Sequence, residues 1–296
     1  MKRAFSIGSF ALAIFFILVG GGFGSVSVVN GLTHEKEVKP GEVYEAVIIL
    51  KNIDPDVENV KIYQTDYFFT AEGKNYYDPP GKIARSNASW LTLIQKRITL
   101  PPKSQSEVRY QVKVPNDPGL KGTYWSMIMV EEMPKAAAQE AQAKKDSISF
   151  GIRQVMRSGI QVVTHIGDTG LRQIKFIKTE LKLSQGAKGL AIDVENTGER
   201  WLRPYLYADL FDLKGKSLGR FDGGRGRLFP GTSFRYTVDF GKIPNGTYKT
   251  LVVVDNKDEN VFGAQYTLNF NAPASKLAVS SPKSAADQTP PKKKFP

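Results

Sequence analysis

Residues 105–132 read QSEVRYQVKVPNDPGLKGTYWSMIMVEE, and this stretch decides the fold class. Its first half alternates strictly between apolar and polar residues, which is typical of a half-buried β-strand. The alternating apolar positions are Val108, Tyr110, Val112 and Val114. Residues 116–119, NDPG, predict a turn, because Pro fixes φ and Gly tolerates positive φ. A second strand is therefore expected over residues 122–132.

Short strands and turn signals continue on both sides of this stretch. Residues 39–41 (KPG) precede it and residues 244–246 (PNG) follow it as further turns. Regularly spaced short strands of this kind indicate β-sandwiches. The sequence thus predicts an all-β chain with two immunoglobulin-like β-sandwich domains, residues 25–166 and residues 167–271, which meet near residues 166–170.

Between the two predicted domains lie a segment without large apolar residues and then the longest predicted strand. Residues 134–146 contain mainly Ala, Gln, Glu and Lys, and we expect a mobile loop there. Residues 148–166 then alternate over a longer stretch than the usual 3–10 residues of a strand. Such a strand could reach from the edge of the first domain into the junction with the second.

The two ends of the chain differ from the rest in composition. Met1-Lys2-Arg3 is followed by an uncharged apolar run and then by Gly20, Gly21, Gly22 and Gly24. This pattern predicts a signal peptide over residues 1–24, with an uncleaved membrane anchor as the alternative. Residues 272–296 are rich in Ala, Ser, Pro and Lys, which predicts a disordered basic tail. We expect export to the periplasm or cell envelope.

Composition narrows the chemistry that the chain can perform. It has no cysteine, which excludes disulfides, cysteine-ligated zinc and thiol nucleophiles. Its only two histidines, His34 and His165, lie in different predicted strands, and surface or junction positions fit them better than a role as base or metal ligand. We therefore predict no enzyme, no cofactor and no metal. The net charge of +12 favours acidic partners or surfaces without identifying them.

Two polar segments have a functional and a structural interpretation. Residues 255–260 (DNKDEN) could bind calcium, but they lie between two predicted strands and lack the Gly and terminal Glu of a calcium loop, which favours a hairpin. Residues 222–227 (DGGRGR) are followed by Leu-Phe-Pro rather than by the helix that a phosphate cradle needs, which favours a turn. A basic patch could still form from Arg200, Arg203, Arg220, Arg225 and Arg227. An acidic glycan or lipid surface suits it better than nucleic acid in an exported protein.

Several stretches in the first domain resemble known families. They are residues 39–41 (KPG), 89–91 (SWL) with 98–102 (ITLPP), 112–115 (VKVP) with 122–125 (GTYW), and 152–162 (IRQVMRSGIQV). In this order they resemble the periplasmic pilus-assembly (PapD-like) chaperones, and also the peptidoglycan-binding domain of WxL-interacting proteins. The second domain fits the two-domain plan of the chaperones by its position.

The resemblance to the chaperones implies a partner and a mode of binding. An exported pilus or surface subunit would add a strand along residues 150–162, because an open sheet edge offers main-chain hydrogen bonds and side-chain pockets. The implied partner-binding residues are Phe150, Ile152, Gln154, Met156, Ile160, Gln161 and Lys36. The alternative, implied by the second resemblance, is a cell-envelope binding or scaffold module that contacts peptidoglycan or another anionic polymer.

The sequence departs from the chaperones at the anchor for the terminal carboxylate of the subunit. The family uses an Arg of the first strand and a Lys of the last strand. Here Gln161 takes the last-strand position, and Lys36 is the cationic candidate near the first strand. A neutral amide cannot supply a charge-assisted hydrogen bond to a carboxylate. The resemblance therefore implies a divergent, chaperone-like binding protein.

Overall fold

The computed structural model describes residues 25–133, 155–184 and 187–271. Both the predicted signal peptide (residues 1–24) and the predicted basic tail (residues 272–296) lie outside the described residues. So do the predicted loop over residues 134–146 and three of the proposed partner-binding residues, Phe150, Ile152 and Gln154.

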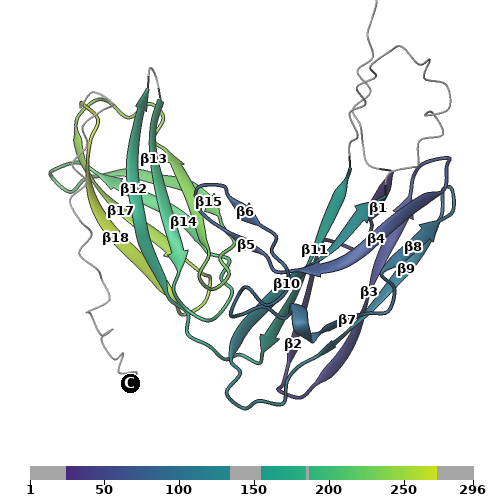
Figure 1. Ribbon diagram of the computed structural model, residues 1–296. Coiled ribbons are helices and arrows are strands. Elements are labelled where there is room, and N and C mark those ends of the chain that lie inside the picture. Colours follow the sequence, from purple (N-terminus) through teal and green to yellow (C-terminus); the bar gives the residue numbers. More distant parts are fainter. Residues whose placement is uncertain (1–24, 134–154, 185–186, 272–296) are drawn as a thin grey trace, which may run out of the picture.

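The first half of the described chain forms two facing sheets and a small hairpin (Figure 1). One sheet has the strand order β1-β3-β9-β7, and the other has the order β2-β11-β10-β4-β8. The strands are β1 (Val26–Val28), β2 (Thr33–Val38), β3 (Val43–Asn52), β4 (Glu58–Thr65), β7 (Leu91–Leu93), β8 (Arg97–Leu100), β9 (Gln105–Lys113), β10 (Gly122–Glu132) and β11 (Arg157–Ile166). The hairpin is β5 (Phe68–Phe69) with β6 (Asn75–Tyr76), and a short 3-10 helix, η1, spans Ala88–Trp90.

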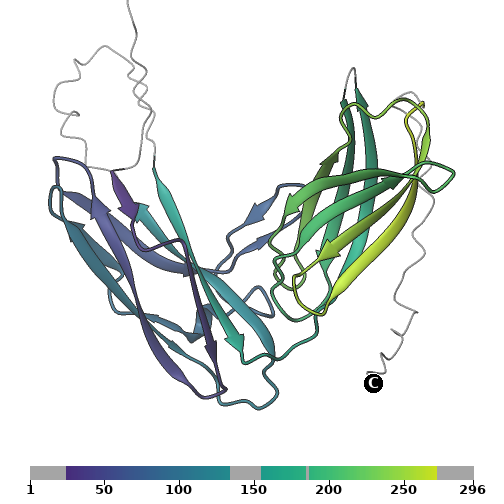
Figure 2. The same cartoon turned by 180° about the vertical axis from the view of Figure 1, so that it is seen from behind.

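The second half forms a similar pair of sheets (Figure 2). Their strand orders are β12-β13-β16 and β15-β14-β17-β18. The strands are β12 (Ile174–Ser184), β13 (Ala187–Asn196), β14 (Tyr205–Phe211), β15 (Ser217–Arg225), β16 (Ser233–Asp239), β17 (Thr247–Asp255) and β18 (Val261–Asn269). The predicted all-β fold with two sandwiches is confirmed.

Each sandwich has its own apolar core. In the first, the alternating residues Val108, Tyr110 and Val112 of β9 face Ile128 and Val130 of β10 within one cluster of buried side chains. A separate cluster fills the second sandwich. Because strand side chains alternate in direction, each sheet contributes every second residue to its core. The residues of β10 that alternate with Ile128 and Val130 therefore point away from this core, toward the outside of the sandwich.

Two strands of the structure were not expected from the sequence. β2 reads THEKEV, which lacks an apolar alternation because β2 is an edge strand whose residues 35–37 are exposed. β15 ends in the Gly-rich segment that we expected to be a turn. Its pairing with β14 shifts register between Leu206 and Tyr207, next to Gly223 and Gly224. Glycine often marks such irregularities in a strand.

The two sandwiches lie at an angle, like the arms of a V, and meet in an aromatic junction (Figures 1 and 2). Trp125 and Val163 of the first sandwich pack there against Trp201 and Phe229 of the second. The ring of Phe229 stacks between those of Trp125 and Trp201, with ring-centroid distances of 4.8 and 4.7 Å. Both pairs of rings are nearly parallel, with interplanar angles of 16° and 15°, so the three rings form one continuous stack.

A hairpin from the first sandwich makes a second contact between the arms. The β5–β6 hairpin turns at residues 71–73 and extends toward the second sandwich (Figure 1). The backbone N–H of Ala71 donates a hydrogen bond of 2.9 Å to the hydroxyl of Ser233. The ring of Phe69 also contacts Phe229 edge-on, at 6.3 Å between centroids. The V is thus held by a ring stack at its base and by this hairpin above it.

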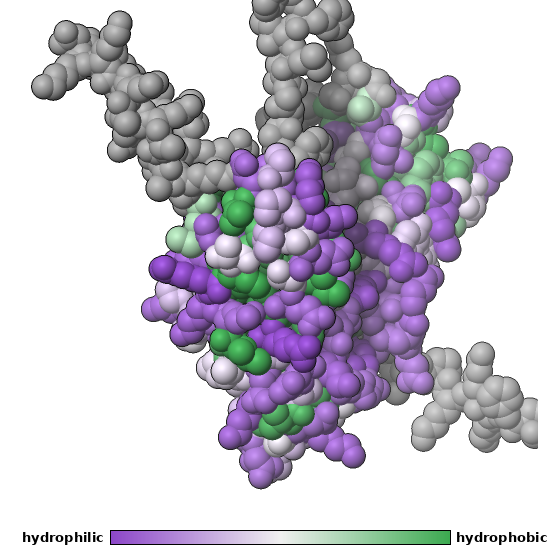
Figure 3. Space-filling model, turned by 90° about the vertical axis from the view of Figure 1, so that its right-hand side faces the viewer, coloured by the Kyte–Doolittle hydropathy of each residue, from purple (hydrophilic) through white to green (hydrophobic). Residues whose placement is uncertain are grey.

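The surface of the first sandwich is mostly hydrophilic on its outer side. Figure 3 shows apolar residues there as separate patches between hydrophilic ones. Broad contiguous apolar patches are what mark large protein or membrane contacts. No helix within the described residues is long and apolar enough to cross a membrane.

Candidate functional site

The candidate site is the edge of β11 that lies beyond the end of β2. β11 pairs on one side with β10 over its whole length. On its other side, β2 runs parallel to it only from Gln161 to Ile166. The backbone N–H of Gln161 donates to the carbonyl of Leu32 at 2.9 Å. From this residue onward, the segment that contains β2 covers this side of β11. Within the described residues, no strand pairs with this side of β11 before Gln161.

Strand geometry shows which backbone groups this edge exposes. Successive residues of a strand direct their N–H and C=O groups to opposite sides. Met156 accepts a hydrogen bond from the N–H of Glu132 on β10, so residues of even number face β10. Arg157 and Gly159 therefore direct their backbone groups outward, in line with Gln161. An added strand would find two consecutive outward positions there.

The predicted partner-binding residues take different places around this edge. Met156 is 38% exposed just before β11, whereas the side chain of Ile160 is fully buried in the core. A partner on the edge would therefore meet the backbone near Ile160 and not its side chain. Gln161 is half-buried, and its Oε1 lies 3.4 Å from the hydroxyl of Thr33.

The structure does not bring Lys36 and Gln161 together as one anchor. Lys36 is exposed on β2 and stands opposite Thr164, whereas Gln161 stands opposite Thr33. The two positions are thus three residues apart along the parallel ladder. A carboxylate bound at Gln161 would need a different cation.

The odd-numbered residues of β10 and β11 line a pocket on the outer face of the sheet. Met129 stands between Tyr63 of β4 and Gly159 of β11, while Met127 stands between Thr65 and Gln161. The pocket has a volume of about 330 Å³. Its walls are Tyr63, Thr65, Tyr77, Met127, Met129, Arg157 and Gly159. Gly159 and Arg157 also form the free edge, so edge and pocket are adjacent.

The corner of this pocket is held by polar contacts around Glu131. The hydroxyl of Tyr63 donates to this carboxylate at 2.6 Å, and Nε of Arg157 lies 2.9 Å from it. Burial, followed by the hydrogen bond to Glu131, raises the pKa of Tyr63 above its ordinary value. Tyr63 therefore stays neutral, and the charge of Arg157 is balanced.

His165 lies on the same face of β11, at the junction of the sandwiches. Its Nδ1 lies 2.9 Å from the hydroxyl of Thr123, which also accepts the backbone N–H of Trp201 at 2.9 Å. Its ring stacks near Trp201 at 6.1 Å, and its Nε2 lies 3.7 Å from Glu35. Burial, with a further contribution from Arg200, lowers the pKa of His165. His165 thus supports the junction.

His34 and the predicted polar segments also have structural surroundings. His34 Nδ1 lies 2.9 Å from the hydroxyl of Tyr110, and burial lowers the pKa of this histidine. The carboxylate of Asp255 accepts the backbone N–H of Lys257, and that of Asp258 accepts the backbone N–H of Asn260, which closes the predicted hairpin. No group of three or more His, Cys, Asp or Glu within the described ranges could hold a metal ion.

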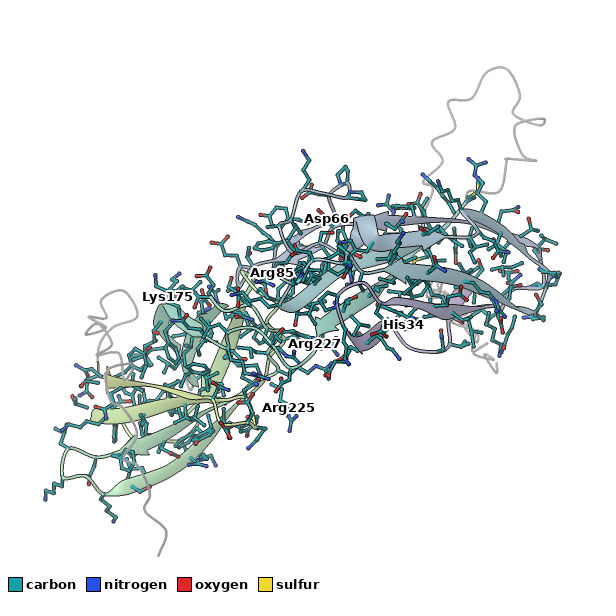
Figure 4. All side chains as sticks on the ribbon, turned by 90° about the horizontal axis from the view of Figure 1, so that it is seen from below. His34, Asp66, Arg85, Lys175, Arg225 and Arg227 are labelled. Atoms are coloured by element: carbon teal, nitrogen blue, oxygen red, sulfur yellow. The ribbon has the colours of Figure 1, made fainter. Side chains whose placement is uncertain are left out.

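The predicted basic patch divides into paired and unpaired arginines. Arg203 lies over the ring of Trp201 at 4.0 Å and pairs with Glu35, while Arg220 pairs with Asp209 at 2.7 Å. Figure 4 shows Arg227 at the junction of the sandwiches and Arg225 beside it on the second sandwich. Among the side chains that the structure describes, neither of these two has an ion-pair partner.

The pocket on the outer face of β10 and β11 was missed by the sequence prediction. The prediction assigned one row of alternating side chains to the partner, but the sequence alone could not tell which row faces the core. A signal was present in β10. Met127 and Met129 interleave with Ile128 and Val130, so that both faces of the strand are apolar. Such a run predicts a strand with contacts on both sides.

No family model matches the chain, and no curated protein matches it. Among solved structures, the chain is similar to a chain from a chaperone–tip adhesin complex of CFA/I fimbriae biogenesis, with 9% identity, a TM-score of 0.45, and coverage of 82% of this chain and 98% of that one. It is also similar to a chain of the CsuC–CsuE chaperone–tip adhesion subunit complex from Csu pili of Acinetobacter baumannii, with 11% identity, a TM-score of 0.40, and coverage of 81% and 98%. The E. coli chaperone DraB shares 13% identity over 80% of this chain and 97% of that one, with a TM-score of 0.38.

Proposed function

We propose that the protein is a non-enzymatic, chaperone-like protein of the periplasm that binds an exported pilus or surface subunit by β-strand addition. The binding site is the free edge of β11 at Arg157 and Gly159, extended by the residues before it. The observation that carries this proposal is that β2 begins only opposite Gln161, so no strand of the described residues covers this side of β11 before Gln161. The class of partner follows from the sequence resemblance to the pilus-assembly chaperones.

The free edge has the properties that strand addition needs. Main-chain hydrogen bonds supply affinity, and pockets for alternate side chains supply specificity. β10 and β2 hold the rest of β11 in place, so the edge is formed before a partner arrives. Preorganisation of this kind lowers the entropy cost of binding. Met156, Gln161 and the three residues outside the described part, Phe150, Ile152 and Gln154, remain predicted side-chain contacts.

The experiment compares two substitutions of Arg157. Arg157→Pro removes the outward N–H at the first residue of β11, a position where proline is tolerated in a sheet. Arg157→Ala keeps that N–H. Both substitutions remove the guanidinium group of Arg157, so the two variants differ at the backbone N–H. Tagged wild-type protein and both variants are used to recover subunits from periplasmic extract, and affinities for the recovered subunit are then measured.

We expect Arg157→Pro to bind the subunit roughly tenfold more weakly than Arg157→Ala. The reason is that a carbonyl of the added strand would lose its donor, which costs about 1–3 kcal/mol when the group is buried. Equal affinities of the two variants would show that this edge does not pair with the partner. Thermal unfolding of both variants serves as the control for folding.

A second candidate function is binding to an anionic envelope polymer. Arg225 and Arg227 favour it, because they lie close together without ion-pair partners among the described residues. On this hypothesis the protein sediments with purified cell walls at low salt and is released at high salt, since exposed charges are screened. Arg225→Gln together with Arg227→Gln would abolish this sedimentation. Sedimentation that is insensitive to both salt and these substitutions would exclude this function.

A further inference from the structure

We propose that the pocket beside the free edge binds a phenol or indole ring, supplied by a Tyr or Trp side chain of the bound partner. The pocket is bounded by Met127, Met129, Gly159 and Thr65. The preference for a phenol or indole ring depends only on the residues that line the pocket. The assignment of the ring to a partner rests on the proposed strand addition.

Gly159 keeps the pocket open. A Cβ at this position would lie 3.0 Å from Sδ of Met127 and 3.4 Å from Sδ of Met129. Both sulfurs therefore converge on the space that a side chain of residue 159 would occupy. Of the two pocket residues on the free edge, Arg157 and Gly159, the glycine therefore adds no side chain to the pocket. A strand added at this edge would bring its own side chains over this opening.

The walls of the pocket suit an aromatic ring. Thioether sulfurs make favourable contacts with aromatic rings, and the rings of Tyr63 and Tyr77 can pack edge-on or offset against a third ring. Arg157 can lie over a ring face as a cation while its charge remains balanced by Glu131. The volume of about 330 Å³ is at the lower end of small-molecule pockets and is large enough for one ring system.

Thr65 adds a polar requirement to this apolar pocket. Its side chain is only 7% exposed, and its hydroxyl has no hydrogen-bond partner among the described residues. A buried hydroxyl without a partner is unfavourable, so an occupant that offers a hydrogen-bonding group gains affinity. The O–H of a phenol and the N–H of an indole meet this requirement, whereas a plain hydrocarbon ring does not. The pocket therefore prefers Tyr or Trp to Phe.

The test uses p-cresol and toluene as analogues of Tyr and Phe, with full-length protein labelled at its methionine methyl groups. We expect p-cresol to shift the NMR signals of Met127 and Met129 saturably, and to bind about fivefold more tightly than toluene. The signals of Met133 and Met156 serve as internal references, since these residues do not line the pocket. Thr65→Val should bring the two affinities together, because it keeps the shape and removes the hydroxyl.

A pair of glycine variants tests whether the ligands bind in this pocket. Gly159→Ala places a methyl group against both sulfurs and should weaken both ligands. Gly189→Ala is the matched control on β13, where the added Cβ would meet nothing closer than 3.8 Å. If p-cresol shifts neither Met127 nor Met129 in the wild-type protein, or if Thr65→Val leaves the preference for p-cresol unchanged, the pocket chemistry is wrong.

Competition with the partner tests the source of the ring. Saturating p-cresol should reduce recovery of the subunit, whereas cyclohexanol, which has a hydroxyl but no aromatic ring, should not. If p-cresol binds and recovery is unchanged, the ring does not come from the partner. The NMR measurement needs no partner, so its result is independent of the comparison of Arg157→Pro with Arg157→Ala.

Discussion

Single side chains at the junction link the two sandwiches by hydrogen bonds. Thr123 is fully buried, and its hydroxyl accepts the backbone N–H of Trp201 from the other sandwich. Because that hydroxyl has one hydrogen, it can donate it to Nδ1 of His165. The neutral histidine then carries its own proton on Nε2, toward Glu35. The junction thus contains His165, one of the two histidines of the chain, as a group that can take up a proton when the pH falls.

At this scale we predict that stability falls as the pH drops below about 6.5, the ordinary histidine pKa. Burial and Arg200 lower the pKa of His165 in the folded protein, so the unfolded chain takes up the proton first. The contribution of His165 to stability is therefore fully present above its unfolded-state pKa. It is lost as the pH falls from the unfolded-state pKa to the folded-state pKa. His34 contributes with the same sign, because burial also lowers its pKa.

His165→Asn isolates the junction contribution. Asn keeps a hydrogen-bonding group near Thr123 but does not titrate. Chemical denaturation of wild type and variant at pH 7.5 and pH 5.0 should show a smaller loss of unfolding free energy in the variant, with His34 present in both. An equal loss in the two proteins would show that His165 does not contribute to the pH dependence.

At the scale of elements, the strands next to the junction depend on close backbone contacts. Gly122 begins β10 with a φ of +76°, and a Cβ there would lie 2.1 Å from the carbonyl oxygen of Glu199. Thr123 then donates its backbone N–H to that same carbonyl at 2.8 Å. The first residues of β10 are thus tied to the connection between β13 and β14 of the second sandwich, and no side chain fits between them.

We predict that Gly122→Ala destabilises the protein by roughly 1–3 kcal/mol more than Gly167→Ala, the range for overpacking a filled site. Both glycines have positive φ, but a Cβ on Gly167 would meet nothing within 4 Å. The difference between the variants therefore measures the clash and not the backbone conformation. Equal unfolding free energies in urea would contradict the described contact.

The sequence predicted elements well where side-chain alternation is strong. β9 and β12 are such cases, and both are strands in the structure. It failed for β2, whose exposed residues follow no apolar pattern, and for β15, whose glycines resemble a turn. For the site, the sequence pointed to the long strand before the junction, but not to the face of β11 that carries the pocket. Alternation defines two rows of side chains, and only tertiary packing decides which row is buried.

The whole molecule is a V whose two arms are joined by a cluster of aromatic side chains. The two cores are separate clusters, and the third cluster, with Phe229 at its centre, joins them. The free edge of β11 and the pocket belong to the same sheet face as His165 and Val163, which contact the second sandwich. The second sandwich thus borders the face that carries the pocket.

We predict that Phe229→Ala loosens the V without unfolding either sandwich. The substitution removes the central ring of the stack, whereas neither separate core includes this residue. Small-angle X-ray scattering should show a broader range of particle dimensions, and tryptophan emission should shift to longer wavelength as Trp125 and Trp201 gain water. Phe221→Ala, which removes a ring contact inside the second sandwich, is the control. Unchanged scattering of Phe229→Ala would show that the ring stack does not set the angle.

Strand addition on β11 is tested most directly by amide hydrogen exchange in the complex with the recovered subunit. The N–H groups of Arg157 and Gly159 face the free edge, while that of Gln161 is already bonded to Leu32. We predict that exchange at Arg157 and Gly159 slows strongly on binding, with little change at Gln161. Unchanged exchange at both positions in a complex that is fully formed would contradict strand addition at this edge.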